Sequence, residues 1–250
     1  MKNKMQLVIE RRNKLFHTIS NDPELTITEL AEHFRTSEIT IRRDLQALRK
    51  ENKIELFFGG YKVIQSESID LITCCRTAIA RYAASLVEDN DIIFINTSST
   101  AISMISYISA KNVTVITNNG KAINMEFPHS VSVYLTGGEI RNPKSALVGD
   151  MAMRTIREIR VHKSFLGCTG LSIQEGMTTK NANEVNINSL MLENATISSY
   201  ILADFTKFNA IGNFTSCPTP AIRNIITDSC ADESAVQQFR EAGINIIRAK

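Results

Sequence analysis

The stretch TSEITIRRDLQALRK, from Thr36 to Lys50, decides the fold of the first part of the chain. Its apolar residues Ile41, Leu45 and Leu48 recur at i, i+4 and i+7, the spacing that places three side chains on one face of a helix. The pattern therefore predicts a helix with one buried face. At about 100° per residue, the opposite face gathers Ile39, Arg43, Gln46 and Lys50, with Thr40 and Arg42 on its flanks.

The polar face of this helix has the side chains that read DNA. Arg and Gln carry forked donors and acceptors that match base edges in the major groove. Ser37 stands where an N-cap is needed, which leaves backbone N–H groups for a phosphate. An ordinary amphipathic helix with a solvated charged face is the alternative, and the segment before the helix helps to decide between the two.

That preceding segment predicts a second short helix. Thr26 and Glu29 have the spacing of a capping box, and Leu30 and Phe34 follow at i, i+4. Two residues separate the predicted helices, so they pack as a helix-turn-helix. We expect a DNA contact surface made of Thr26, Ser37, Ile39, Thr40, Arg42, Arg43, Gln46 and Lys50.

These motifs carry a family resemblance. The residues from Leu30 to Phe34, Ser37, and those from Thr40 to Leu45 resemble the amino-terminal signature of the DeoR family of bacterial transcription regulators. A helix over residues 5–20 and a two-stranded wing over residues 54–64, turning at a Gly-Gly pair, complete a winged helix-turn-helix. The family usually has Arg and His where this wing has Leu56 and Phe58, so we expect operator affinity to depend more on the recognition helix or on oligomeric assembly.

Composition describes a soluble globular protein of two domains. The chain has 250 residues, of which 43% are hydrophobic and 22% charged, and its net charge of +2 excludes a global polycation. Its five cysteines lack CxxC or Cys/His ligand spacing, so we expect no disulfide framework, no metal site and no cofactor. With no apolar leader and no run long enough to span a membrane, we expect a cytoplasmic protein.

The second part of the chain alternates strand and helix patterns, which predicts an α/β domain with a sheet covered on both faces. We expect the winged helix-turn-helix domain in residues 1–62, a linker in 63–75 and the α/β domain in 76–250. Strands are predicted at 91–96, 113–117, 131–136, 163–168, 200–204, 222–227 and 244–247, and helices at 77–87, 100–108, 150–160, 184–195 and 233–242.

Polar loops follow several of these strands. In an open α/β sheet, ligands bind beyond the carboxyl ends of the strands, where loop amides and helix N-termini converge. Plain helix capping is the alternative for the first loop, and the later loops, which add amides and cations, favour an anion site. The expected ligand contacts are Asn96, Thr97, Ser98, Ser99, Thr100, Asn118, Gly137, Gly138, Arg141, Asp204 and Lys207.

The same loops, with Glu184, resemble the carboxyl-terminal sensor domain of the DeoR family, which is similar in fold to ribose-5-phosphate isomerase. The resemblance implies that this domain binds a phosphorylated sugar or a related metabolite. The family's first loop usually reads Asp-Ser-Gly-Thr-Thr, whereas this chain has Asn96, Ser98 and Ser99 at the first, third and fourth places. The family usually has a Lys two residues after the position of Glu184, where this chain has Asn186. We therefore expect the ligand to differ from the commonest ligands of the family.

The sequence therefore predicts a DNA-binding repressor of a carbohydrate operon, controlled by a sugar phosphate and acting as a homo-oligomer. Two alternatives stay open. One is a sugar-phosphate isomerase with a fused regulatory module, for which Asp204 and Glu184 are the acidic candidates. The other is a regulator that has lost its effector.

Overall fold

The computed structural model describes residues 4–22, 25–51, 53–57, 60–63, 66–142 and 144–249. The chain divides into two compact units, Met1–Thr73 and Cys74–Lys250, called here the N-terminal and C-terminal units. Each is described by itself.

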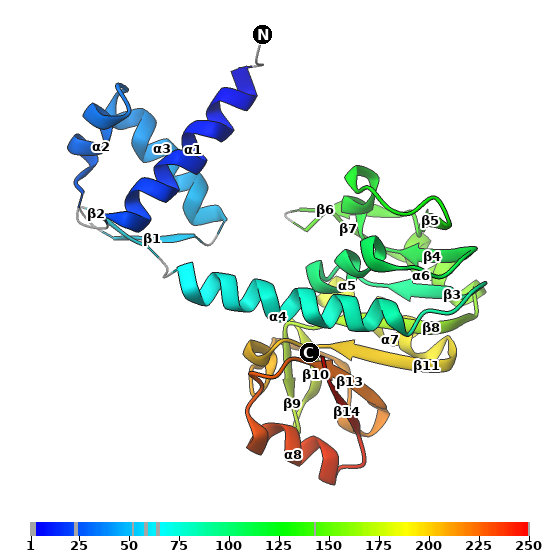
Figure 1. Cartoon of the computed structure of the whole chain (residues 1–250). Coiled ribbons are helices and arrows are strands. Elements are labelled where there is room, and N and C mark those ends of the chain that lie inside the picture. Colours follow the sequence, from blue (N-terminus) through cyan, green and yellow to red (C-terminus); the bar gives the residue numbers. More distant parts are fainter. Residues whose placement is uncertain are drawn as a thin grey trace. The chain divides into compact units, whose positions relative to one another are not determined.

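The N-terminal unit is a helix-turn-helix that is preceded by one helix and followed by a two-stranded hairpin (Figure 1). Its hydrophobic core joins the helices over residues 4–50 and the first strand of the hairpin through Leu15, Leu30, Ile41, Leu45 and Ile54, each 1% exposed or less. The prediction of a winged helix-turn-helix is confirmed, although Phe58, Gly59 and Ile64 of the predicted wing lie outside the described residues. The elements are α1 (Lys4–Asn21), α2 (Ile27–His33), α3 (Glu38–Lys50), β1 (Ile54–Phe57) and β2 (Gly60–Val63).

A buried carboxylate fixes α3 against α1. Asp44 is 1% exposed, and its two oxygens accept hydrogen bonds from Arg11 Nε at 2.7 Å and Arg12 Nε at 2.9 Å. A buried carboxylate is stable only when it is paired and hydrogen-bonded. These two bonds therefore hold the recognition helix in place from its inner side.

The helix α4 (Ser66–Ser85) includes most of the segment 63–75 that the sequence analysis expected to be a linker. The helix begins at Ser66 and runs without interruption, because no Gly or Pro occurs between Ser66 and Ser85. The division between the two units falls inside this helix, between Thr73 and Cys74.

The C-terminal unit is built on a seven-stranded parallel sheet in the order β14-β13-β11-β8-β3-β4-β5 (Figure 1). All seven strands predicted from the sequence are members of this sheet, so the α/β prediction is confirmed. The strands are β3 (Ile92–Ile95), β4 (Val113–Thr117), β5 (Val131–Leu135), β8 (Val161–Gly167), β11 (Ala195–Leu202), β13 (Asn224–Thr227) and β14 (Asn245–Arg248).

Helices cover both faces of the sheet. Ile93 and Ile95 of β3 belong to one hydrophobic cluster with Ile79 of α4, and Phe94 belongs to another cluster with Ile156 of α6 and Phe239 of α8. Successive strand residues point to opposite faces, which explains why these strands are apolar without interruption. The helices are α5 (Ser99–Ser103), α6 (Asp150–Glu158), α7 (Ala182–Glu193), α8 (Glu233–Glu241) and the short 3-10 turns η1 (Met104–Tyr107), η2 (Gly120–Asn124), η3 (Phe205–Lys207) and η4 (Thr219–Ala221).

Five short strands were not predicted. They form a two-stranded hairpin and a three-stranded antiparallel sheet beside the main sheet. Each has three or four residues, too few to show a period in the sequence. They are β6 (Glu139–Arg141), β7 (Ala146–Val148), β9 (Gly170–Ser172), β10 (Gly176–Thr179) and β12 (Phe214–Cys217). In the described part of the chain, no helix is long and apolar enough to cross a membrane.

Candidate functional site

The outer face of α3 is exposed and polar. Ile39 is 78% exposed, and Arg43, Gln46 and Lys50 are exposed beside it. Ser37 caps the helix by accepting a hydrogen bond from the Thr40 amide at 3.3 Å. The structure therefore brings the predicted recognition residues together on one surface of the N-terminal unit.

Four predicted DNA-contact residues already have partners within the N-terminal unit. Ser37 and Thr40 bond each other, since their hydroxyls also lie 3.0 Å apart. Arg42 forms an ion pair with Glu38 at 3.6 Å, one turn earlier in α3. The Thr26 hydroxyl donates to Glu29 Oε2 at 2.7 Å in the predicted capping box. These bonds, all exposed, orient the start of each helix.

A cavity of about 290 Å³ lies in the C-terminal unit, beyond the carboxyl ends of β3, β8 and β11. Its wall includes the predicted residues Asn96, Thr97, Ser98, Ser99, Thr100, Glu184, Asp204 and Lys207. Residues from loops far apart in the sequence thus meet where the rule for parallel sheets places a ligand.

The cavity is more basic than the sequence indicated. Arg76, Lys121 and Lys144 line it together with Lys207, whereas Glu184 and Asp204 are its acidic residues. Four cations against two carboxylates leave an excess of two positive charges. This excess favours binding of an anion with about two negative charges. Sequence analysis missed Arg76 and Lys144, which come from a helix and from the loop after β6, and Lys121, the residue directly after the polar loop that follows β4.

Asn96 organises the first loop. Its Nδ2 donates to the Gly167 carbonyl at 2.9 Å and to Asn188 Oδ1 at 3.0 Å, and its Oδ1 accepts from the amides of Gly167 and Ser98. An aspartate could accept but could not donate. Asn96, where the family usually has Asp, therefore ties β3 to β8 and α7, because its side-chain amide both donates and accepts hydrogen bonds.

Ser98 fits into space left by a glycine. Its hydroxyl accepts a hydrogen bond from the Ala101 amide and so caps α5. A Cβ added to Gly167 would lie 1.9 Å from Ser98 Oγ, so the glycine makes room for this serine.

Glu184 is buried at the cavity wall and binds several neighbours. Lys144 Nζ lies 3.2 Å from Oε1, and Thr179 Oγ1 donates to Oε2 at 2.8 Å. Thr97 Oγ1 is a further donor at 3.4 Å. The carboxylate links three separate segments around the cavity.

Asp204 is 2% exposed and faces Arg76, whose Nε lies 2.7 Å away. Burial acts to raise the pKa of Asp204, but hydrogen bonds from Thr206 and Arg76 and the charges of Lys207 and Arg76 outweigh it and lower that pKa. Asp204 is therefore held as a carboxylate.

Four predicted ligand residues do not line this cavity. Asn118 Nδ2 donates to the Leu147 carbonyl, Arg141 pairs with Glu139, and Gly137 and Gly138 have φ angles of +72° and +106° before β6. A Cβ at position 138 would lie 2.5 Å from the Val148 carbonyl oxygen. These residues shape the β6-β7 hairpin.

The chain matches two family models. Residues 11–67 match the DeoR-like helix-turn-helix domain, and residues 75–229 match the DeoR C terminal sensor domain. The first match lies within the N-terminal unit and the second within the C-terminal unit.

Curated relatives match over nearly their full length. The HTH-type transcriptional regulator GolR of Listeria innocua is 30% identical, with 95% of this chain and 97% of that protein covered. The lactose phosphotransferase system repressor of Lactococcus lactis is 27% identical, with 92% and 95% covered. Among solved structures, ribose 5-phosphate isomerase from Plasmodium falciparum matches 53% of this chain and 51% of its own at 14% identity, with a TM-score of 0.37.

Proposed function

Because the chain belongs to the DeoR family of transcriptional regulators, we propose that it represses a carbohydrate-metabolism operon under control of a sugar phosphate. It is a DNA-binding regulator with a helix-turn-helix and a sensor domain. The observation that carries the proposal is the cavity of the C-terminal unit, where four cations surround hydroxyl and carboxylate groups. The cations suit a phosphate, and Glu184 and Asp204 suit sugar hydroxyls.

Recognition of the operator is assigned to the outer face of α3. Arg43 and Gln46 read base edges, while Ser37, Thr40, Arg42 and Lys50 contact the sugar-phosphate backbone. Ile39, at 78% exposed, provides an apolar contact such as a thymine methyl group. The Thr26 hydroxyl, at the start of α2, is assigned to a backbone phosphate.

We propose domains with the limits expected from the sequence, 1–62 and 76–250, and a linker over residues 63–75 that includes the start of α4. We infer that the protein acts in the cytoplasm of a bacterial cell, where operator DNA lies.

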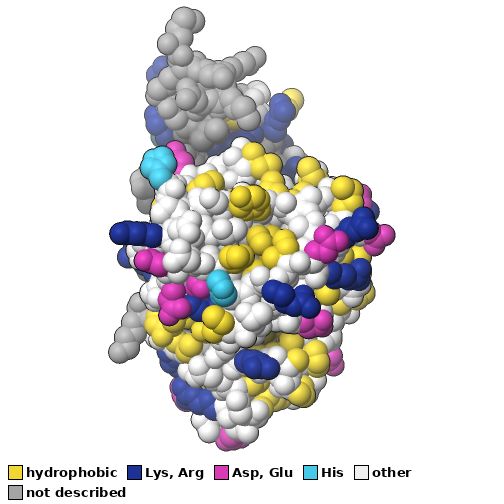
Figure 2. Space-filling model, turned by 90° about the vertical axis from the view of Figure 1, so that its right-hand side faces the viewer, with side chains coloured by type: hydrophobic (Ala, Val, Ile, Leu, Met, Phe, Trp, Pro, Cys, Tyr) yellow, Lys and Arg dark blue, Asp and Glu magenta, His cyan; other side chains and the backbone are white. Residues whose placement is uncertain are grey.

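We assign this chain to a homo-oligomer. Tyr134 on the edge strand β5, Ile140 on β6 and Met151 on α6 are 60%, 62% and 72% exposed. Figure 2 shows that hydrophobic side chains gather in patches on one face, with charged side chains around them. Exposed apolar patches support contact with a second copy.

Enzyme activity is not part of the proposal. An isomerase needs a carboxylate base of suitable pKa. Asp204 has a lowered pKa, and Glu184 is bonded to Lys144, Thr97 and Thr179. Both acidic candidates are thus committed to neighbouring groups, and the curated relatives reported above are named as regulators.

The experiment is genome-fragment binding by the purified full chain, with and without a panel of phosphorylated sugars. We expect discrete fragments that one sugar phosphate releases. Lys207→Ala should bind the same fragments but lose the response, whereas Lys111→Ala, an exposed lysine outside the cavity wall, should respond as the native protein does. Fragments that stay bound with every sugar would contradict the assigned effector and favour a regulator that has lost it.

A further inference from the structure

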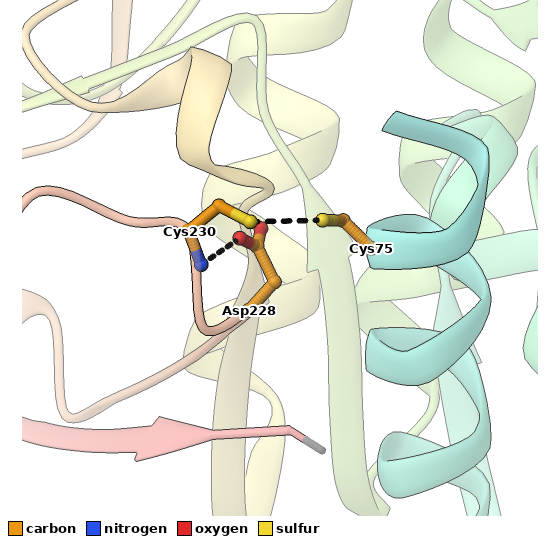
Figure 3. Close-up of side chains that lie close together, drawn as sticks. All are labelled: Cys75, Asp228 and Cys230. Atoms are coloured by element: carbon orange, nitrogen blue, oxygen red, sulfur yellow. Dashed lines mark hydrogen bonds between the residues drawn. The ribbon is translucent and has the colours of Figure 1, made fainter. Parts of the chain in front are cut away.

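A second cluster of reactive side chains lies apart from the residues that line the ligand cavity. Cys75 on α4, Asp228 after β13 and Cys230 two residues later bring their ligand atoms within 4.8 Å of one another (Figure 3). The three residues belong to the C-terminal unit, and none of them lines the cavity. Cys75 and Asp228 are buried, and Cys230 is exposed.

We propose that Cys75, Asp228 and Cys230 bind a thiophilic divalent cation, Zn²⁺, with a water as the fourth ligand. Two thiolates and one carboxylate are a donor set that zinc accepts. The exposed side of Cys230 gives the ion a path from solvent and leaves room for the water.

The distance between the sulfurs fits this ion. A tetrahedral zinc ion about 2.3 Å from each sulfur holds the two sulfurs about 3.8 Å apart. Cys75 Sγ and Cys230 Sγ are 3.9 Å apart, joined by an S–H···S hydrogen bond (Figure 3). Little movement is therefore needed when the ion replaces the proton between them.

The remaining bonds hold the ligands in position. Asp228 Oδ1 accepts from the Cys230 amide and Oδ2 from the Phe205 amide, each at 2.8 Å. Each carboxylate oxygen keeps a second lone pair for a metal. Arg248 donates to the carbonyls of Ser229 and Ala231, on either side of Cys230. This outer layer of bonds fixes the loop that carries two of the three ligands.

Charge and proton balance follow from the ligands. A cysteine binds a metal ion as the thiolate, so each thiol must give up its proton when the cation binds. Binding converts two thiols to thiolates and releases both protons to solvent. Zinc, two thiolates and one carboxylate carry a net charge of −1.

Two of the proposed metal ligands are connected to residues of the ligand cavity. Cys75 precedes Arg76, which pairs with Asp204. Asp228 accepts a hydrogen bond from the amide of Phe205, the residue after Asp204. An ion at this site would change the affinity of the cavity for its effector, a consequence that rests on the proposed function. The metal site itself does not.

The test uses the reduced full chain, freed of metal by a chelator and kept under argon, without DNA or sugar. Co²⁺ is expected to give a thiolate-to-cobalt charge-transfer band that saturates at about one ion per chain, and Zn²⁺ should remove it. Because no sugar is present, failure here is separate from failure of the sugar response.

Variants locate the site. Cys75→Ser, Cys230→Ser and Asp228→Asn should each weaken Zn²⁺ binding at least tenfold, roughly the least effect expected for a ligand. Cys74→Ser is the matched control, because Cys74 is the exposed neighbour of Cys75, and it should bind as the native chain does. Circular dichroism checks the fold of each variant. Cys230→Ser changes an exposed side chain, so this variant should fold as the native chain does.

Two outcomes would overturn the proposal. One is a full band in both Cys75→Ser and Cys230→Ser. The other is a native chain that gives no charge-transfer band. If that chain also loses two free thiols to a Cys75–Cys230 disulfide in air, with oxygen as the oxidant, the pair is a redox couple.

Discussion

Arg76 Nε lies 2.7 Å from Asp204 Oδ2, so the part of α4 that belongs to the C-terminal unit is bonded to the end of β11 at the cavity wall. A phosphate that pairs with Arg76 competes with Asp204 for the same guanidinium group. Binding of the proposed effector would therefore act directly on α4, the helix that contains the division between the two units.

The pH dependence of stability should report the Asp204 bond. The folded pKa of Asp204 is lowered, so its contribution is present above the unfolded pKa of about 3.9 and is lost as pH falls through the folded value. Asp204→Asn should reduce the free energy of unfolding by about 1–3 kcal/mol at pH 7, and urea unfolding should show this difference shrinking below about pH 4. A difference that grows as pH falls would contradict this assignment. Glu158→Gln, on an exposed residue, is the control.

Operator specificity should depend on Arg43. Arg43→Ala should cost about 1–3 kcal/mol on the operator, roughly 5- to 150-fold in affinity, with a smaller loss on random duplex. Equal losses on both DNAs would show a phosphate contact only. Arg154→Ala removes the same charge from a side chain that is 82% exposed on α6, and should bind as the native protein does.

Stability of the recognition helix should depend on Asp44. Asp44→Ala removes both arginine bonds of a buried carboxylate and should destabilise the N-terminal unit by about 1–3 kcal/mol. Thermal unfolding and limited proteolysis of the full chain measure this. Arg11→Gln should have the smaller effect, because Arg12 still bonds the carboxylate, and the reverse order would contradict the geometry.

The family's aspartate should not suit this protein at position 96. Asn96→Asp removes the donor to the Gly167 carbonyl and to Asn188 Oδ1. Asn188 can turn its amide and donate to the new carboxylate. The Gly167 carbonyl, however, loses its donor, which should lower the free energy of unfolding by about 1–3 kcal/mol. Chemical denaturation measures the cost, and an unchanged midpoint would show that Asn96 does not tie the strands together.

The regular elements followed from the sequence because their patterns are local. The uninterrupted apolar run Ile92–Ile95 is typical of a strand buried on both faces, and Ile41, Leu45 and Leu48 repeat with the helix period. The extent of α4 did not follow, since its first turns have no clear period although nothing breaks the helix.

The cavity was predicted in part. Asn96 to Thr100, Asp204 and Lys207 directly follow strands, so topology alone brings them to one edge. Arg76 reaches the cavity from a helix and Lys144 from the loop after β6. No residue spacing in the sequence predicts that either side chain lies at the cavity. Cys75 and Cys230 are 155 residues apart, so their contact depends on tertiary structure alone.

The contact between Ser98 and Gly167 has a consequence for the history of this protein. Any side chain at position 167 would occupy the space of the Ser98 hydroxyl, whereas a glycine at position 98 would leave that space empty. The two positions should therefore covary among its orthologues: those with serine at 98 keep glycine at 167, and only lineages with glycine at 98 are free to accept alanine there.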